Sequence, residues 1–178
     1  MPSFMSYPSF LQMNFRTYIQ FDDEPGIYFF SVDVNRMLTM ITAKNLLQLP
    51  YEMAEISMER IKDYYLFKSK RTKQIDSDAR IFAKYQPLEN IVCNKPNTLS
   101  HWLTDRYCFW MINGNKIIKG PISHMPWTLY HAELELIKIN IAPSSVHNKY
   151  LHSNPLAHYG KSMHAYLHPF EQQGIYNH

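Results

Sequence analysis

Residues 14–21 alternate between polar and apolar side chains, which is the pattern of a β-strand that buries one face. The turn sequence Asp-Asp-Glu-Pro-Gly follows at 22–26, and the next run, 27–34, is nearly all apolar. A strand that is apolar on both faces is usually central in its sheet, with neighbours that cover each side. The two runs therefore predict an antiparallel hairpin whose second strand lies in the middle of a sheet.

Strand patterns continue through most of the chain. The sequence Asn113-Gly114-Asn115 lies between two apolar runs and predicts a tight hairpin. The run 127–141 alternates in its middle, which favours a strand, but its length leaves a partly helical structure open. Residues 143–159 are expected to form a polar loop. The strands expected beyond the first hairpin are 51–59, 62–73, 79–85, 105–112, 116–122 and 161–167.

Two short helices are expected among these strands. Asn35 can cap a helix that continues to about residue 47, and Pro50 prevents it from running further. The residues available for its buried side are Met37, Leu38, Ile41 and Leu46. Residues 97–103 resemble a second helix, and Pro87 and Pro96 are expected in a loop. Many strands with two short helical insertions predict an α+β domain with a barrel-like sheet.

The length of 178 residues fits one domain, and 46% hydrophobic residues with 19% charged ones are typical of a globular chain. Residues 1–12 are expected to be an irregular lead-in, and residues from about 169 to 178 a loose tail. Aromatic residues make up 15% of the chain, which fits either a packed aromatic core or an apolar ligand pocket.

The formal charge of +3 is small, and the one basic run, Lys68, Lys70, Arg71 and Lys73, is expected on a solvated strand. Nucleic-acid binders usually concentrate such charge on one face within a known motif, so nucleic acid is not an expected partner. The two cysteines form no disulfide framework, and no metal site or cofactor is predicted. No membrane span or signal peptide is visible, so the expected compartment is the cytoplasm.

Six short motifs follow one another between residues 10 and 168. They are Asn-Phe-Arg-Thr-Tyr at 14–18, Gly-Ile-Tyr-Phe-Phe-Ser-Val-Asp at 26–33, Leu-Pro-Tyr at 49–51, Leu-Thr-Asp-Arg-Tyr-Cys at 103–108, His-Met-Pro-Trp at 124–127 and Pro-Leu-Ala-His-Tyr at 155–159. Together they resemble the YqjF-like family of uncharacterised bacterial proteins. The resemblance implies the fold of acetoacetate decarboxylase, a cone-shaped, mostly antiparallel β-barrel with a ligand cavity.

In acetoacetate decarboxylase a lysine after a proline forms a Schiff base with the keto acid, and a second lysine beside it helps to keep the first one neutral. The resemblance places Tyr51 and Glu52 at these two positions, directly after Pro50. A phenol cannot form an imine, and a carboxylate would keep a neighbouring amine charged. The chain is therefore not expected to be a Schiff-base decarboxylase.

Two further departures concern the start of the chain. Relatives carry a glutamate shortly before the first motif, where this chain has Gln12, so a carboxylate with an acid–base role would be lost. Family members also carry further strands upstream of residues 14–21. A sheet without those strands would expose unpaired backbone along one edge, which predicts self-association through that edge or low stability.

The polar face of the first strand supplies two of the candidate ligand-binding residues. Arg16 could hold a carboxylate there, and the alternative is a structural ion pair with Asp33 or Glu52. The Tyr51 hydroxyl could orient a ligand oxygen, or Tyr51 could be an ordinary half-buried strand residue. The full set of candidates is Arg16, Tyr18, Tyr51, His124 and His158. Asp105 and Arg106 are expected to form an ion pair that fixes a turn.

Three functions remain open at this point. The first is a small-molecule-binding barrel for an apolar carbonyl or carboxylate compound, with Arg16 and Tyr51 as polar anchors. The second is an enzyme of the same fold that uses Tyr51, His124 or His158 for proton transfer on a keto- or enol-type substrate. The third is a structural or interaction role, or no surviving activity.

Overall fold

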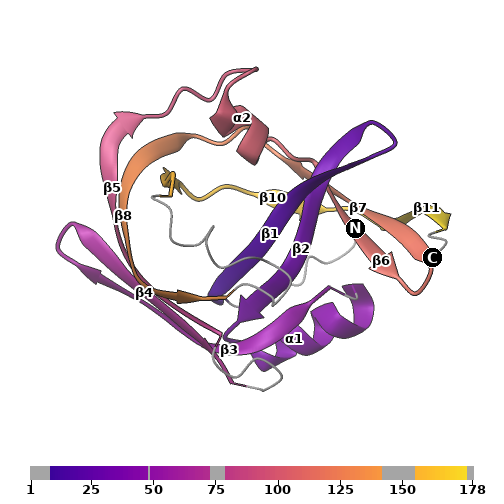
Figure 1. Ribbon diagram of the computed structural model, residues 1–178, viewed down its shortest axis with the longest axis horizontal. Coiled ribbons are helices and arrows are strands. Elements are labelled where there is room, and N and C mark those ends of the chain that lie inside the picture. The colour runs from indigo at the N-terminus through magenta and orange to yellow at the C-terminus, as the bar shows by residue number, and fades with distance from the viewer. Residues whose placement is uncertain (1–8, 48, 73–78, 142–154, 176–178) are drawn as a thin grey trace, which may run out of the picture.

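The computed structural model describes residues 9–47, 49–72, 79–141 and 155–175. Within these residues, eleven strands form one sheet, and two short helices lie between them (Figure 1). The helices are α1 (Met37–Thr42), which continues as a π-helical turn (Ala43–Leu47), and α2 (Leu99–Thr104). The strands are β1 (Gln12–Phe21), β2 (Glu24–Val34), β3 (Tyr51–Ile61), β4 (Tyr64–Arg71), β5 (Arg80–Ile91), β6 (Cys108–Asn113), β7 (Lys116–His124), β8 (Leu129–Asn140), β9 (His158–Gly160), β10 (Ala165–Leu167) and β11 (Glu171–Ile175).

The hairpin expected at the start of the chain is confirmed, because β1 pairs antiparallel with β2 over its whole length. Asp22 and Asp23 make the turn with φ angles of 46° and 62°, a left-handed conformation that aspartate tolerates better than most residues. The turn is shorter than the sequence indicates, since Pro25 and Gly26 already belong to β2.

β2 is central, as its apolar sequence predicts, and it makes the sheet mixed. β1 lies along one edge of β2, while β6 and β3 share the other edge, opposite residues 27–28 and 32–34. Both pairings on this second edge are parallel. A parallel neighbour needs a long crossover, and residues 35–50 with α1 supply it between β2 and β3.

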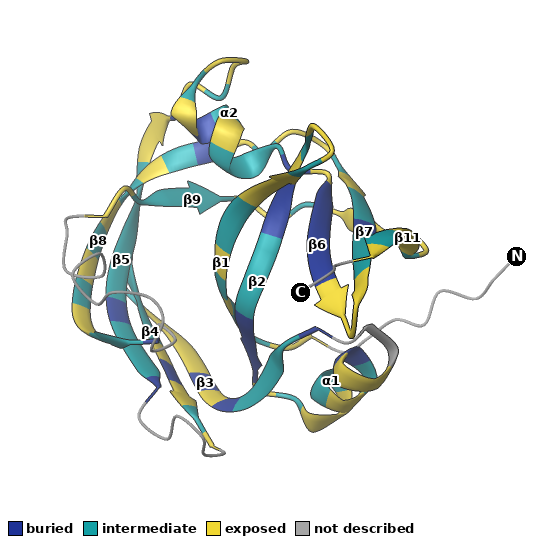
Figure 2. Ribbon diagram, turned by 45° about the vertical axis from the view of Figure 1, so that its right-hand side comes forward, coloured by how far each residue is buried: buried dark blue, intermediate teal, exposed yellow. Residues whose placement is uncertain are grey.

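The sheet is strongly curved but not closed. Its order is β10-β7-β6-β2-β3-β4-β5-β8-β9, with β1 paired to β2 and β11 to β7. β3, β4, β5 and β8 bend round one side of the molecule, and β6 and β7 extend to the other (Figures 1 and 2). In the part of the chain that the structure describes, no pairing joins β9 to β10. The expected mostly antiparallel barrel is therefore confirmed only in part.

The first helix differs from the prediction in its cap and in the face it buries. Its N-cap is Arg36, whose side chain makes no capping hydrogen bond, and the Asn35 amide oxygen instead accepts from the Leu11 backbone nitrogen at 2.9 Å. Ala43 is buried, but three of the side chains expected to be buried are exposed: Met37, Leu38 and Ile41. The fourth, Leu46, lies outside the described side chains. Six helical residues span less than two turns, which is too short for a reliable apolar periodicity.

Two segments that were expected outside the sheet belong to it. Pro87 lies inside β5 opposite Ala132, and the register shifts between Pro87 and Ile91. Proline has no N–H to donate, so it is tolerated where the ladder is irregular. Residues 171–175 are not part of a loose tail, because they form β11 and pair with β7.

The strand expected at 161–167 is shorter, since β10 begins at Ala165, and the end of the expected polar loop begins β9 (His158–Gly160). The other expectations are confirmed or lie in undescribed segments. The second hairpin forms from β6 and β7 around Gly114, whose φ is 61°, and α2 matches the second helix. The ambiguous run 127–141 is a strand, β8. The lead-in at 1–8 and most of the expected loop, 142–154, lie outside the described residues.

An aromatic core lies against one part of β2. Phe109 is 2% exposed, and its ring contacts those of Phe29 and Phe170 edge to face at centroid distances of 5.8 and 5.5 Å. Ile27, Leu49 and Met111 complete the buried cluster. Part of the aromatic content is therefore used for packing. None of the helices in the described ranges has the length and apolar character that a membrane span needs.

The outer edge of β1 has no strand partner among the described residues, since β1 pairs only with β2 there. Ile19 on this strand is 36% exposed. We expect the edge to pair with that of a second copy, because unpaired strand edges are templates for association. Ile19→Lys should shift the chain toward monomer in size-exclusion chromatography with light scattering, because edge lysines oppose such pairing.

Ile137→Lys is the matched control, because it adds the same charge at an exposed position on β8, away from this edge. Equal oligomeric states for the unchanged chain and both variants would contradict association through β1.

Candidate functional site

The buried face of the sheet carries four polar residues, here called the inner polar cluster: Ser31, Asp33, Ser69 and Arg71. Arg71 on β4 donates from Nε to Asp33 Oδ1 at 2.8 Å and from Nη2 to the Ser31 hydroxyl, both on β2. β3 lies between these strands and presents Ala54 opposite Arg71. A small residue at this position lets the arginine side chain cross β3.

Burial sets the electrostatics of this ion pair, because the side chains of Asp33 and Arg71 are only 1% and 12% exposed. Desolvation raises the pKa of the Asp33 carboxyl, and Arg71 lowers it without fully offsetting that effect. The folded-state pKa therefore lies above 3.8, the ordinary pKa of an aspartate carboxyl. The folded protein thus holds the Asp33 proton more tightly than the unfolded chain does. The contribution of Asp33 to stability therefore falls as the pH rises above 3.8 and the carboxyl ionises.

Two groups of the inner polar cluster have no hydrogen-bond partner among the described residues. The Ser69 hydroxyl is buried and has no hydrogen-bond partner. Arg71 Nη1 also has none among the described residues, since the hydrogen bonds of this side chain use Nε and Nη2. Ser69 and Arg71 are two residues apart on one strand, so their side chains share a face. The cluster can therefore offer a hydroxyl and a guanidinium to an oxyanion.

The Pro50-Tyr51-Glu52 segment begins β3 beside this cluster. Tyr51 packs against the aromatic core, and burial raises the pKa of its hydroxyl. Glu52 lies opposite Asp33 in the ladder, and its Oε1 is 3.1 Å from Lys44 Nζ. An ammonium held in an ion pair is not the neutral nucleophile that imine formation needs.

A second group of residues, here called the aromatic clamp, consists of Tyr18, Trp102 and Arg106. Arg106 is 7% exposed, and its guanidinium carbon lies 4.7 Å from the Trp102 ring centroid and 5.7 Å from that of Tyr18. The Tyr18 hydroxyl donates to the Leu103 carbonyl oxygen at 2.9 Å. These cation–π contacts and the hydrogen bond fasten α2 to β1.

The expected ion pair between Asp105 and Arg106 is wrong. Arg106 Nη1 donates to the backbone oxygen of Asp105 at 3.1 Å, whereas the Asp105 carboxylate lies 3.3 Å from His101 Nε2. The histidine is one helical turn earlier, which is a favourable spacing for side-chain contact. Adjacent residues point in different directions, and Arg106 turns toward the rings of the aromatic clamp.

The two candidate histidines have different surroundings. His124 Nδ1 lies 2.8 Å from the Met125 carbonyl oxygen, and its Nε2 lies 3.3 Å from that of Arg106. Both of its ring nitrogens thus face backbone oxygens. His158 lies 6.0 Å from His131 between ring centroids, and burial, followed by the charge of His131, lowers its pKa.

The structure brings together only some of the candidates. Tyr18 and His124 both contact Arg106, and the Arg16 guanidinium lies 5.9 Å from the Tyr18 ring centroid. Tyr51 and His158 lie elsewhere. Arg16 does not form the alternative ion pairs, since Asp33 pairs with Arg71 and Glu52 with Lys44.

Arg71 was not among the sequence candidates. It belongs to the basic run that was expected on a solvated strand, but alternation along β4 separates that run into two faces. Lys68 and Lys70 lie on one face, and Ser69 and Arg71 lie on the other. The spacing of Ser69 and Arg71, two residues apart on a strand, was the feature of the sequence that could have placed both side chains on the buried face.

The Cys108 thiol and the potential metal ligands of the described residues supply no further candidate site. Burial, followed by the charge of Glu24, raises the pKa of the Cys108 thiol to about 11, so it stays protonated near neutral pH. No group of three or more potential metal ligands occurs among the described residues.

The arrangement of strands matches solved structures of one fold class. Acetoacetate decarboxylase from Legionella pneumophila aligns over 97% of this chain and 70% of its own, with 13% identity and a TM-score of 0.57. A second acetoacetate decarboxylase structure aligns over 94% and 69%, with 12% identity and a TM-score of 0.59. The enduracididine biosynthesis enzyme MppR, complexed with pyruvate, aligns over 92% and 66%, with 11% identity and a TM-score of 0.53. The protein therefore has an acetoacetate decarboxylase-like fold.

The family model of DUF2071, an uncharacterized conserved protein, matches residues 1–164, and the chain belongs to this family. The uncharacterized protein YqjF of Bacillus subtilis strain 168 is 35% identical over 153 residues. This match covers 86% of the chain and 62% of YqjF, so the chain spans less than two thirds of that relative's length. The resemblance noted from the six motifs is confirmed.

Proposed function

We propose that this protein binds a small carboxylate at the inner polar cluster, without forming an imine. The observation that carries the proposal is the state of Arg71. Its guanidinium is held in one orientation by Asp33 and Ser31, while Nη1 has no partner among the described residues. A guanidinium fixed in this way loses little conformational entropy when it binds a carboxylate.

The Ser69 hydroxyl supports the same site. A buried hydroxyl without a hydrogen bond is unfavourable, and a carboxylate oxygen would accept its proton. The neighbouring side chains on this face are apolar, including Ala54 and Ile56 of β3, which are 1% and 9% exposed. A low-polarity surround strengthens a charge-assisted hydrogen bond.

The fold class suggests the kind of carboxylate. Acetoacetate decarboxylase is named for a keto acid, and the MppR structure holds pyruvate, another keto acid. This chain has Tyr51 and Glu52 where the resemblance places the decarboxylase lysines, and Lys44 is paired with Glu52. We therefore propose recognition of a small keto acid through its carboxylate rather than covalent attack on its carbonyl.

The contacts give less support to proton transfer by His124 and Tyr51. Both nitrogens of His124 face carbonyl oxygens. The Tyr51 hydroxyl has a raised pKa, which makes it a poor base near neutral pH.

Calorimetric titration with pyruvate tests the proposal. Ser69→Ala and Arg71→Lys should each weaken pyruvate binding about tenfold or more, because each removes hydrogen bonds to a charged group. Arg16→Lys is the control, since it makes the same change of side chain outside the cluster, and it should leave the affinity unchanged. Borohydride added with pyruvate should not increase the mass of the protein by that of the reduced adduct.

Ser69→Ala keeps the test valid if the Arg71 variant folds poorly, because it removes only an unpartnered hydroxyl. An unchanged affinity in folded Ser69→Ala and Arg71→Lys proteins would overturn the site. A trapped pyruvate adduct would overturn the non-covalent mechanism.

A further inference from the structure

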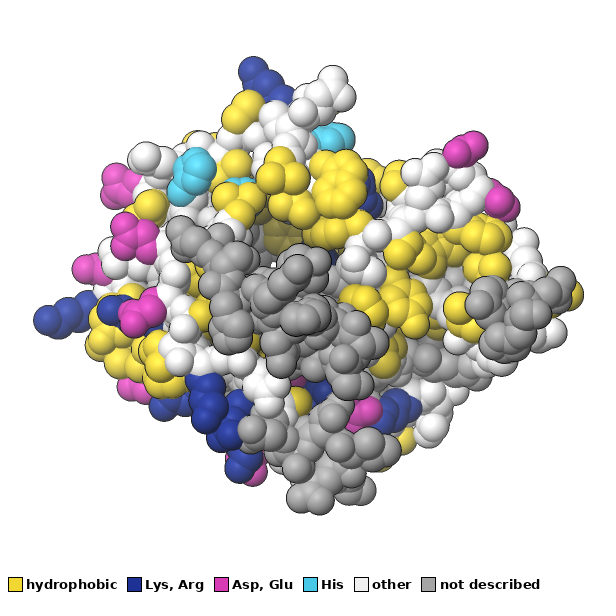
Figure 3. All heavy atoms as spheres, in the orientation of Figure 1, with side chains coloured by type: hydrophobic (Ala, Val, Ile, Leu, Met, Phe, Trp, Pro, Cys, Tyr) yellow, Lys and Arg dark blue, Asp and Glu magenta, His cyan; other side chains and the backbone are white. Residues whose placement is uncertain are grey.

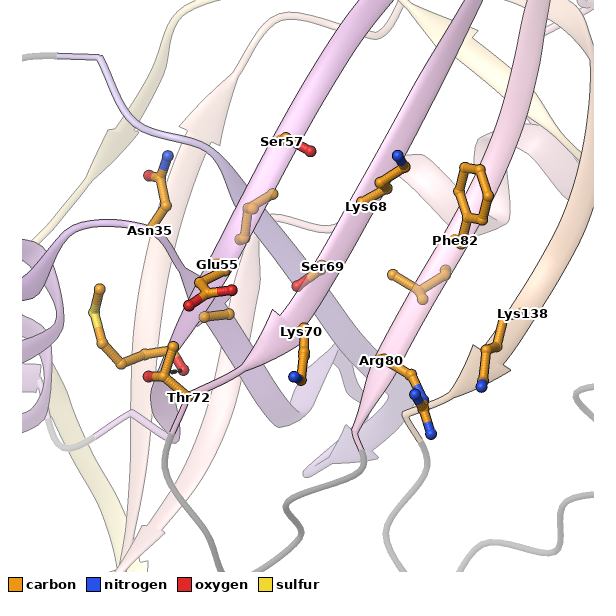
Figure 4. Close-up of a pocket in the computed structure, with 14 residues that line it drawn as sticks. Asn35, Glu55, Ser57, Lys68, Ser69, Lys70, Thr72, Arg80, Phe82 and Lys138 are labelled. Atoms are coloured by element: carbon orange, nitrogen blue, oxygen red, sulfur yellow. Dashed lines mark hydrogen bonds between the residues drawn. The ribbon is translucent and has the colours of Figure 1, made fainter.

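The outer face of the same sheet, opposite the inner polar cluster, has a groove of about 620 Å³ across β3, β4, β5 and β8 (Figure 4). Its charged lining residues are one acid, Glu55, and four cations, here called the basic groove: Lys68, Lys70, Arg80 and Lys138. In Figure 4 these side chains rise from neighbouring strands toward one side of the sheet, and β2 lies behind it. Figure 3 shows basic side chains gathered at the lower left, over β4 and its neighbours.

The strand register places these cations side by side. Lys70 lies directly opposite Arg80, and Phe82 lies between Lys68 on one neighbouring strand and Lys138 on the other. Like charges opposite one another destabilise a sheet. Among the described residues, no ion pair joins Lys68, Lys70 or Lys138 to a carboxylate. Glu55 lies opposite Lys70 on the other neighbouring strand, so this acid offsets one of the four cations and the groove keeps an excess of positive charge.

The concentration is large for this chain. The four cations and Glu55 give the basic groove a formal charge of +3, which equals the formal charge of all 178 residues. Fourteen basic and fourteen acidic residues remain, so the rest of the chain is balanced. The positive excess of the protein is thus focused on one part of one sheet face, where it would attract anions.

The size of the groove limits the anion that fits. Neighbouring strands are about 5 Å apart, and two residues along a strand span about 7 Å, so the four cations cover only a small rectangle. Phe82 lies within it, with its ring 4.9 Å from Lys68 Nζ, and Ser57 adds a hydroxyl. We propose that the basic groove binds a short chain of linked phosphates, either free or as part of a nucleotide.

The test uses inorganic tripolyphosphate and the full chain, titrated at low salt. Lys70→Gln with Lys138→Gln should weaken binding at least about tenfold, because each lysine donates to a charged group. Two control substitutions, Lys116→Gln and Lys62→Gln, remove the same charge at exposed positions outside the groove and should leave the affinity unchanged. Affinity should also fall with rising salt as the phosphate contacts are screened. Equal affinities in the two double variants, or no binding at low salt, would overturn the proposal.

Further ligands separate the sources of the phosphate chain. ATP that binds more tightly than tripolyphosphate, with the difference lost in Phe82→Leu, would support a nucleotide stacked on this ring. Equal affinities for ATP and tripolyphosphate would support recognition of the phosphates alone. A single-stranded oligonucleotide that binds more tightly than both, and is weakened by the Lys70 and Lys138 changes, would overturn the proposal in favour of nucleic acid.

Discussion

Asp33→Ala should lower the free energy of unfolding by about 3–5 kcal/mol, because it leaves the Arg71 guanidinium buried without its counter-charge. Asp33 is 1% exposed and accepts from Arg71 Nε at 2.8 Å. Desolvation raises the pKa of Asp33 even beside Arg71, which is the direction expected when the cost of burying a charge offsets its attraction to the partner. The pair therefore adds little net stability, while the loss of one partner is costly. Chemical denaturation followed by circular dichroism measures the change.

Glu24→Ala is the matched control, because it also removes a carboxylate from an ion pair. The Glu24 and Lys119 side chains are 45% and 19% exposed at a distance of 2.7 Å, so this loss should be below about 1 kcal/mol. Asp33→Ala combined with Arg71→Met should recover much of the stability, because no buried charge remains. A loss in Asp33→Ala no larger than that in Glu24→Ala would show that Arg71 does not depend on Asp33.

Gly120→Ala should cost about 3 kcal/mol, at the upper end of the range for overpacked cores. A Cβ at this position would overlap the ring of Phe109. That ring cannot move aside easily, since it is 2% exposed and contacts Phe29 and Phe170. The melting temperature and the free energy of unfolding should both fall.

Gly174→Ala makes the same change in β11, where the nearest atom to a new Cβ would be Phe21 Cζ at 3.5 Å, an ordinary contact. It should leave stability nearly unchanged or slightly raised. The cost of Gly120→Ala should shrink when Phe109 is also changed to Leu, since the smaller side chain leaves room. Additive effects of these two substitutions would contradict steric overlap as the cause.

Local sequence was sufficient for the parts of the fold that depend on neighbours along the chain. The alternation in residues 14–21 predicted β1, and Asn113-Gly114-Asn115 predicted the β6–β7 turn. The parallel pairing of β2 with β3 and β6 could not be predicted in this way, because it depends on which distant strands share an edge. The same limit applies to β11, whose residues carry no strong strand pattern and are held by β7.

The candidate site was predicted less well than the fold. Tyr18 and His124 do converge, but through Arg106, whose partners are two aromatic rings and a backbone oxygen rather than the expected carboxylate. Arg71 depends on Asp33, 38 residues earlier, and on a β3 alanine that leaves room for its side chain. Such a contact requires the order of the strands, which a single sequence does not give.

Lys70 and Arg71 are consecutive on β4, so the basic groove and the inner polar cluster lie back to back on the two faces of one sheet. Charges on opposite sides of so thin a layer of low dielectric interact. A multivalent anion in the basic groove would reduce the positive potential at Arg71 and weaken the binding of a carboxylate there. Thermodynamic linkage makes this antagonism reciprocal, so each ligand would lower the affinity for the other by the same factor. The alternation of a single strand would thus couple the occupancies of two sites whose charged side chains lie on opposite faces of the sheet.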